Sequence, residues 1–180
     1  MVVVEMPEGL CRVHVITGPG KGKTTAAFGL ALRAAGHGLR VCIVQFMKSG
    51  EETGEVVAAK RIRGISVYQY GTGKFVEKDR ITEDDREYAA EALAMAGNIL
   101  EEGECNMLVL DEVNLAAAYG LVKTDEVLDM LKSRKKDIEV VLTGRNAQHE
   151  FVDYADYVSC VDDTKHPFGR GVKARKGVEW

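Results

Sequence analysis

The segment from Gly18 to Thr25 holds residue types that bind a chain of phosphates. Its sequence, GPGKGKTT, follows a β-branched run and opens an Ala-rich helical segment. Glycines at a strand-to-helix turn let backbone N–H groups face inward, and the helix N-terminus adds partial positive charge. Lys23 can reach phosphate oxygens, and the Thr24 hydroxyl can ligate Mg²⁺. We therefore predict a nucleoside triphosphate site. Its expected binding residues are Gly18, Pro19, Gly20, Lys21, Gly22, Lys23, Thr24 and Thr25.

This loop departs from the usual phosphate-loop pattern, G-x-x-x-x-G-K-[ST], at one position. Gly22, Lys23 and Thr24 fit the pattern, but Thr17 stands where its first glycine belongs, and Gly18 comes one residue late. A glycine-rich turn that binds nothing is the alternative. The combination of strand, loop and helix favours phosphate binding over that alternative. We expect a reshaped loop that holds the phosphates in an unusual way.

An acidic pair, Asp111 and Glu112, follows the apolar run at residues 108–110. An apolar strand that ends in a carboxylate is typical of a Walker B element, which binds the Mg²⁺ held by the loop hydroxyl, directly or through water. The predicted metal ligands are therefore Thr24 and either Asp111 or Glu112. The alternative is an acidic pair at an ordinary strand end.

Three further residues are weaker candidates. Arg33 lies on the helix after the loop and reaches either ligand or solvent, and Arg145 follows a strand end, where it could counter phosphate charge or remain a surface arginine. Phe75 follows a glycine-rich break; a core role is the default, but an aromatic on a loop near the site could press on a flat ligand. The four histidines are scattered, which argues against a histidine metal site.

Strand-like runs alternate with helical patterns along the chain. This alternation predicts an α/β fold with a mostly parallel sheet and helices on both faces, and the phosphate-loop motif makes it the P-loop NTPase (RecA-like) type. Ligands in such folds bind beyond the carboxyl ends of the strands. Thr82 and Asp85 form a capping-box pattern, and Thr124 is expected to cap a later helix. The expected strands are 11–17, 40–46, 65–70, 107–110, 139–143 and 157–161, and the expected helices are 23–35, 55–60, 82–102, 124–132 and 147–153.

Length and composition limit the number of domains, the class of partner and the cellular compartment. A chain of 180 residues predicts a single domain over residues 1–180, with a C-terminal tail at 162–180. The formal net charge of −4 argues against nucleic acid as a partner. The four cysteines lack metal-ligand spacing and predict buried thiols in a reducing compartment. No apolar run approaches the roughly 18 residues that span a bilayer, and the start lacks a basic signal region. We therefore expect a cytoplasmic protein without a membrane partner.

Several motifs together resemble those of the P-loop corrinoid (cob(I)alamin or cob(I)yrinic acid a,c-diamide) adenosyltransferases. The resemblance runs from about residue 12 to the C-terminus and is far more specific than a phosphate loop alone. The motifs are GPGKGKTTAAFG at 18–29, RAAGHG at 33–38, VQFMK at 44–48, LDE at 110–112, LTGRN at 142–146, DYAD at 153–156, KHPF at 165–168 and GVKA at 171–174.

The resemblance implies transfer of the 5′-deoxyadenosyl group of ATP to the cobalt of a reduced corrinoid, with release of tripolyphosphate. In that family Co(I) attacks the 5′-carbon, and ATP runs along the loop in the reverse sense. By this resemblance Lys23, Thr24 and Mg²⁺ stabilise the leaving triphosphate, and Asp111 or Glu112 completes the metal site. The resemblance also implies a flavodoxin-like or reduced-flavin electron donor and a homodimer.

Phe75 looks like one of the family's aromatic side chains that help to bind Co(II) corrinoid without its lower axial ligand, so Lys23, Thr24 and Phe75 are the implied catalytic residues. Relatives often place a Trp two residues after this Phe, where the chain has Glu77. The alternatives are a small-molecule kinase or NTPase on the same fold, an ATP-dependent nucleic-acid module and a non-catalytic ATP sensor.

Overall fold

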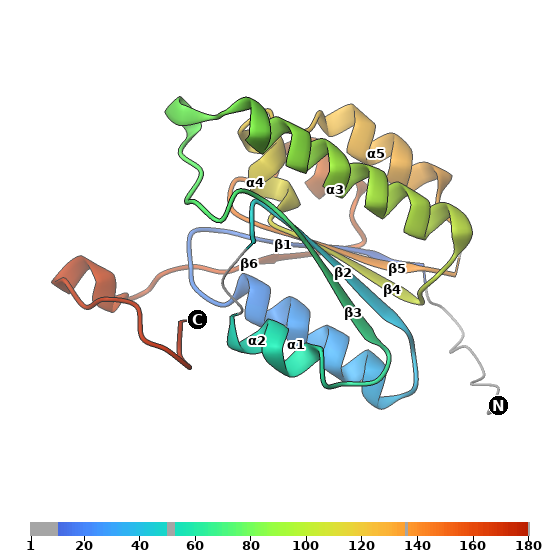
Figure 1. Cartoon of the computed structure of the whole chain (residues 1–180), viewed down its shortest axis with the longest axis horizontal. Helices are drawn as coiled ribbons and strands as arrows, with labels where there is room; N and C mark the ends of the chain where they lie inside the picture. The colour runs from blue at the N-terminus through green and yellow to red at the C-terminus, as the bar shows by residue number, and fades with distance from the viewer. Residues whose placement is uncertain (1–10, 50–52, 136, 180) are drawn as a thin grey trace.

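A parallel sheet forms the centre of the computed structural model, which describes residues 11–49, 53–135 and 137–179. Within this described part, six strands are hydrogen-bonded in the order β3-β2-β4-β5-β1-β6, and every neighbouring pair is parallel (Figure 1). The strands are β1 (Val13–Thr17), β2 (Val41–Phe46), β3 (Ile65–Tyr70), β4 (Met107–Asp111), β5 (Glu139–Thr143) and β6 (Tyr157–Cys160). The predicted α/β class is confirmed.

Helices cover both faces of the sheet. Figure 1 shows α1 and α2 on one face and α3, α4 and α5 on the other. Their bounds are α1 (Lys23–Gly36), α2 (Gly54–Ala59), α3 (Glu83–Glu102), α4 (Val113–Ala118), α5 (Thr124–Ser133) and α6 (His149–Tyr154), with short 3-10 turns η1 (Lys78–Arg80) and η2 (Pro167–Arg170). In the described part of the chain, no helix is both long enough and apolar enough to cross a membrane.

Two apolar layers hold the helices on the sheet. One lies under α1, which contacts the strands through the small side chains of Ala27, Ala31 and Ala34. The other lies under α3, α4, α5 and α6 and includes Leu100, Leu131 and Phe151. Every residue of β2, β4 and β5 is buried, as expected for strands covered on both faces. These central strands give the loops at their ends a rigid base.

Local details confirm some expectations and correct others. The capping box is present: the Asp85 amide donates to the Thr82 hydroxyl, and the Asp85 carboxylate accepts from the Thr82 amide. Thr124 is not the cap of its helix, because Lys123 occupies the cap position and Thr124 is the first helical residue. Cys42 and Cys105 are buried as expected, whereas Cys11 is half-buried and Cys160 is exposed on the edge strand β6, which corrects the expectation of buried thiols for these two residues.

The helix α4 was not predicted. It begins directly after Glu112, which adopts a left-handed backbone conformation with φ of 66°. The sharp turn matters for the site, because it leaves the Asp111 and Glu112 side chains at the carboxyl end of β4.

Candidate functional site

The glycine-rich loop joins β1 to α1 and lies against the chain that leaves β6. A Cβ atom on Gly18 would come within 2.4 Å of the Val161 carbonyl oxygen, and one on Gly20 within 2.8 Å of Asp162. The Gly20 amide donates to Val161 at 2.8 Å, so this N–H is not directed at a phosphate. These two glycines therefore permit a close backbone approach, and for Gly20 alone this corrects our expectation that the loop glycines direct N–H groups inward.

Thr17, which replaces the first glycine of the usual pattern, also has a structural contact. Its hydroxyl accepts a hydrogen bond from the Ala147 amide at 3.2 Å. This bond ties the end of β1 to the loop between β5 and α6. Gly22 caps α1 with φ of 113°, and apart from its own chain neighbours no atom lies within 4 Å of where its Cβ would be. The open backbone at Gly22 is the part of the loop best placed to face a ligand.

Lys23 is a buried cation at the start of α1. Its ammonium donates to the Gly20 carbonyl oxygen at 2.6 Å, which folds the side chain back over its own loop. Burial, followed by repulsion from Arg145, lowers the pKa of Lys23 below its ordinary value. A buried ammonium beside another cation is stabilised by a bound anion. This is the electrostatic environment that a triphosphate would complete.

Asp111 is the centre of a hydrogen-bond network at the carboxyl end of β4. It is fully buried, with 0% exposure. Its Oδ1 accepts from Thr24 at 3.0 Å and from Thr143 at 2.6 Å. Its Oδ2 accepts from Gln45 at 2.8 Å and from Lys48 at 2.7 Å. Burial disfavours its charge, but Lys48 and the hydrogen bonds outweigh burial and hold the pKa of Asp111 below its ordinary value.

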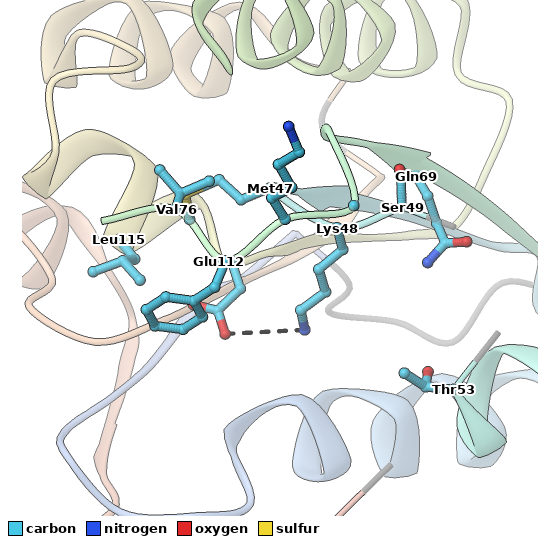
Figure 2. Close-up of a pocket in the computed structure, with 11 residues that line it drawn as sticks. Met47, Lys48, Ser49, Thr53, Gln69, Val76, Glu112 and Leu115 are labelled. Carbon is cyan, nitrogen blue, oxygen red and sulfur yellow. Dashed lines mark ion pairs between the residues drawn. The ribbon is translucent and has the colours of Figure 1, made fainter. Parts of the chain in front are cut away.

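Lys48 and Glu112 point toward one another in the adjoining space (Figure 2), with Lys48 Nζ 3.9 Å from Glu112 Oε1. Burial opposes the charge of Lys48, but Asp111 and Glu112 outweigh it and raise the pKa of the ammonium. Burial and the neighbouring Asp111 raise the pKa of Glu112. The two carboxyl groups of the predicted Walker B pair thus differ: Asp111 is held charged beneath the cavity, and Glu112 lines it.

A large polar cavity lies over this network. It has a volume of about 810 Å³ and is lined by the loop, by Arg145 and by Glu112. A second, more apolar pocket of about 340 Å³ is lined by Met47, Phe75, Val76 and Leu115 among others. The two spaces share part of their wall: Lys48, Thr53, Phe75, Glu112 and Leu115 line both.

The structure brings most of the predicted site residues to the polar cavity. The predicted residues that line it are Gly20, Lys21, Gly22, Lys23, Thr24, Thr25, Phe75, Glu112 and Arg145. Gly18 and Pro19 belong to the loop but do not line the cavity, and Asp111 lies beneath it. Arg33 is exposed, about ten residues or roughly 15 Å along α1 from Lys23, and the structure does not bring it to the site.

Lys21, predicted to bind phosphate, lines the polar cavity and also contacts the C-terminal tail. Its ammonium donates to the Val178 carbonyl oxygen at 3.0 Å and to Glu179 at 3.0 Å. Hydrogen bonds from Arg175 and Lys21 hold the pKa of Glu179 at about 2. The tail therefore returns to the phosphate loop, where Gly177, Val178 and Glu179 form part of the cavity wall. The tail sequence has no periodic pattern, so this contact could not be predicted from it.

Sequence reasoning also missed Lys48, Gln45 and Thr143 as members of the Asp111 network. Lys48 and Gln45 belong to the VQFMK segment, which we assigned no role of its own. They reach Asp111 because β2 lies beside β4, with Gln45 opposite Asp111 in the register. The one sequence feature that could have indicated this role is the position of Lys48, two residues after a strand predicted to be buried.

The predicted metal ligands present oxygen atoms that suit Mg²⁺. The Thr24 hydroxyl is bonded to Asp111, and Glu112 follows Asp111 directly. Mg²⁺ prefers oxygen ligands and is usually bound by one or two carboxylates together with substrate phosphates. Within the described ranges, no group of three or more His, Cys, Asp or Glu side chains could hold a metal ion. The arrangement therefore fits a metal that arrives with a nucleotide.

Comparison with known proteins is consistent with this geometry. Residues 10–180 match the family model described as ATP:corrinoid adenosyltransferase BtuR/CobO/CobP. A corrinoid adenosyltransferase of Pseudomonas aeruginosa is 38% identical over 173 residues, which covers 96% of this chain and 84% of the relative. Those of a Sinorhizobium species and Escherichia coli K12 are each 37% identical, covering 93% of this chain and 79% and 85% of the relatives. This chain therefore belongs to the ATP:corrinoid adenosyltransferase family.

Proposed function

We propose that this protein transfers the 5′-deoxyadenosyl group of ATP to the cobalt of a reduced corrinoid and releases tripolyphosphate. The observation that carries the proposal is the shared wall between the polar cavity and the apolar pocket. The polar side suits a triphosphate, and the apolar side suits part of a large, flat ligand. Their junction is where the ribose 5′-carbon of the nucleotide would meet the cobalt.

The polar cavity would bind the triphosphate through cations and the first turn of α1. Lys23 and Arg145 supply positive charge, and the Gly22 cap leaves the helix N-terminus open. ATP would lie with its ribose toward Phe75, so that the reacting carbon faces the apolar pocket. The reverse sense of ATP binding explains why the loop departs from the form used for phosphoryl transfer.

The reaction is a nucleophilic substitution at carbon. Co(I) donates an electron pair to the 5′-carbon and becomes Co(III), while the carbon–oxygen bond breaks and its electron pair leaves with the triphosphate. Lys23 and Arg145 would meet the charge that develops on this leaving group, and such preorganised charges account for a large share of many enzymes' catalysis. Mg²⁺ held by Thr24 and by Asp111 or Glu112 would supply Lewis-acid stabilisation of the same oxygens.

The apolar pocket would bind the corrinoid through Phe75 and its neighbours. The Phe75 side chain is 88% exposed, which is unusual for a large apolar residue. Met47, Val76 and Leu115 line the same pocket. An exposed aromatic ring beside a nucleotide site can contact the face of a flat ligand, which would bury the ring. We propose that Phe75 favours Co(II) corrinoid that has lost its lower axial ligand.

The test is an anaerobic assay with Mg·ATP and chemically reduced Co(I) cobalamin. We expect a light-sensitive adenosylated corrinoid and an equal amount of tripolyphosphate. Production of ADP without a corrinoid product would overturn the proposal in favour of a kinase or NTPase.

The role of Phe75 is tested separately with Phe75→Ala. We expect a larger loss of transfer with Co(II) corrinoid and a mild reductant than with pre-reduced Co(I). Equal losses in the two assays would remove the axial-ligand role and leave only binding.

Further features rest on the family resemblance. We propose a flavodoxin-like or reduced-flavin electron donor, a homodimer and a cytoplasmic location; the four free cysteines are compatible with a reducing compartment. Light scattering at micromolar concentration tests the dimer, and a monomeric mass would overturn it. Coupled assays with a reduced flavodoxin and with free reduced flavin test the donor, and failure of both would exclude this class.

A further inference from the structure

The ammonium of Lys48 lies among all three predicted metal ligands. Its Nζ is 2.7 Å from Asp111 Oδ2, 3.2 Å from Thr24 Oγ1 and 3.9 Å from Glu112 Oε1. A divalent ion bound by these residues would occupy nearly the same place. The side chain therefore already supplies a positive charge at the position proposed for the metal.

Asp111 has no spare acceptor position in this arrangement. Each of its carboxylate oxygens accepts two hydrogen bonds, and an ionised carboxylate offers about four lone-pair positions in total. A metal ion can therefore bind Asp111 directly only if one of its donors leaves. The four donors are Thr24, Thr143, Gln45 and Lys48.

Of these donors, Lys48 is the one best able to move. Gln45 and Thr143 are buried residues of β2 and β5, with 1% and 0% exposure, and Thr24 is itself a predicted metal ligand. Lys48 follows the end of β2, and its side chain is 29% exposed and lines the polar cavity. Its long, flexible stem can carry the ammonium into that cavity without a change in the sheet.

We infer that Lys48 is a built-in counter-ion of the metal site, which the divalent metal displaces when it enters together with the triphosphate. This inference rests on the proposed function. Two cations a few ångströms apart repel each other, so Lys48 disfavours binding of a bare metal ion. The triphosphate adds negative charge beside the site, which gives the displaced ammonium a new partner. Lys48 thus acts as a positioning residue that couples metal entry to nucleotide binding.

The test measures binding of Mn²⁺ alone to the ATP-free protein, by electron paramagnetic resonance. Lys48→Gln removes the charge but keeps a donor for Asp111, and we expect it to bind Mn²⁺ at least about 10-fold more tightly than the wild type. Lys48→Arg keeps the charge and should bind Mn²⁺ as weakly as the wild type. Unchanged or weaker Mn²⁺ binding by Lys48→Gln would overturn the inference, since a merely structural role predicts no gain.

Two controls separate charge, folding and function. Lys74→Gln removes a positive charge from an exposed lysine that lines only the apolar pocket, and its Mn²⁺ affinity should equal that of the wild type. A matching gain in Lys74→Gln would overturn the inference by showing a general charge effect. Lys48→Met, measured in parallel with thermal melts, should show the same gain as Lys48→Gln, and absence of the gain in a folded Lys48→Met would also count against displacement. Because no corrinoid or ATP is present, failure here leaves the adenosyl transfer assay unaffected.

Discussion

Asp111 and Glu139 are two buried acidic residues at opposite ends of neighbouring strands. Asp111 ends β4, and Glu139 begins β5. Both pKa values are held below the ordinary range by hydrogen bonds and neighbouring cationic or polar groups, despite burial. The two residues differ in the kind of partner that stabilises them.

Glu139 is bound by fixed partners. Its Oε2 accepts from the amides of Cys11 and Arg12 at 3.0 and 2.9 Å, and its Oε1 contacts His14 Nε2 at 2.6 Å. The His14 ring stacks on Tyr157, with the ring centroids 4.6 Å apart. These contacts fix the start of β1 between β5 and β6. None of these residues lines the polar cavity or the apolar pocket.

Among the residues that the structure describes, Asp111 accepts hydrogen bonds only from side chains, and one of them, Lys48, is a cation that also lines a cavity. A low carboxylate pKa therefore does not by itself identify a functional group. A buried carboxylate that accepts hydrogen bonds from backbone amides, like Glu139, holds two segments of the fold together. One whose cationic partner can leave is ready to exchange that partner for a metal and a substrate.

At the phosphate loop, Lys23→Ala should reduce activity more than any other substitution considered below. We expect the rate of adenosyl transfer to fall by at least about 10²-fold, because the variant loses the charge that we propose to stabilise the leaving triphosphate. The fold should be intact, since the contact made by the ammonium is to the Gly20 carbonyl within its own loop. Transfer kinetics and a thermal melt measure both quantities. Near-normal turnover would refute the phosphate role of Lys23.

Glu139→Ala tests whether Glu139 contributes to stability and not to activity. The Cys11 and Arg12 amides would lose their acceptor, and we expect the free energy of unfolding to fall by about 1–3 kcal/mol. The turnover number of the folded protein should stay within about two-fold of wild type. Urea unfolding and transfer assays give the two values. A loss of turnover without a loss of stability would contradict the structural role of Glu139 and indicate a functional one.

Arg145→Ala tests whether Arg145, which lines the polar cavity, contributes to ATP binding. We expect the KM for ATP to rise by up to about 10-fold, the size of one charge-assisted contact. Arg33→Ala is the matched control, because Arg33 is exposed on α1 away from the cavity, and it should leave the KM unchanged. Equal effects of the two substitutions would place the phosphates elsewhere along α1.

The smallest effect concerns the pH dependence of stability. Because the pKa of Glu139 is lowered in the folded state, its stabilising contribution is fully present above the unfolded value of about 4.5 and is lost as pH falls through the folded value. The difference in unfolding free energy between wild type and Glu139→Gln should therefore shrink below about pH 4.5. Urea titrations between about pH 3 and 7 measure it, and a difference that grows toward acid pH would contradict the assignment.

Local features of the site were predictable from the sequence, and contacts between distant segments were not. The strand, loop and helix around Lys23 are contiguous, so their residue types indicate a phosphate site directly. Arg33 was predicted from its helix alone, and only the three-dimensional course of α1 shows that it lies away from the cavity.

The Asp111 network depends on strand order. Gln45 and Lys48 approach Asp111 because β2 lies beside β4, although α2, β3 and α3 separate them in the chain. Thr143 approaches from the other side through β5. The alternation of strands and helices predicts a parallel sheet but does not give the order of its strands. The contact between Lys21 and Glu179 spans nearly the whole chain and has no local signal.

The most direct test compares the Mg²⁺ dependence of adenosyl transfer in Asp111→Asn and Glu139→Gln. Both variants replace a buried carboxylate by an amide of similar shape. We predict that Asp111→Asn raises the Mg²⁺ concentration for half-maximal transfer by at least about 10-fold, because a carboxylate that we propose as a metal ligand loses its charge. Glu139→Gln should leave that concentration unchanged. An equal shift in both variants, or a shift in neither, would contradict the distinction between a structural and a functional carboxylate.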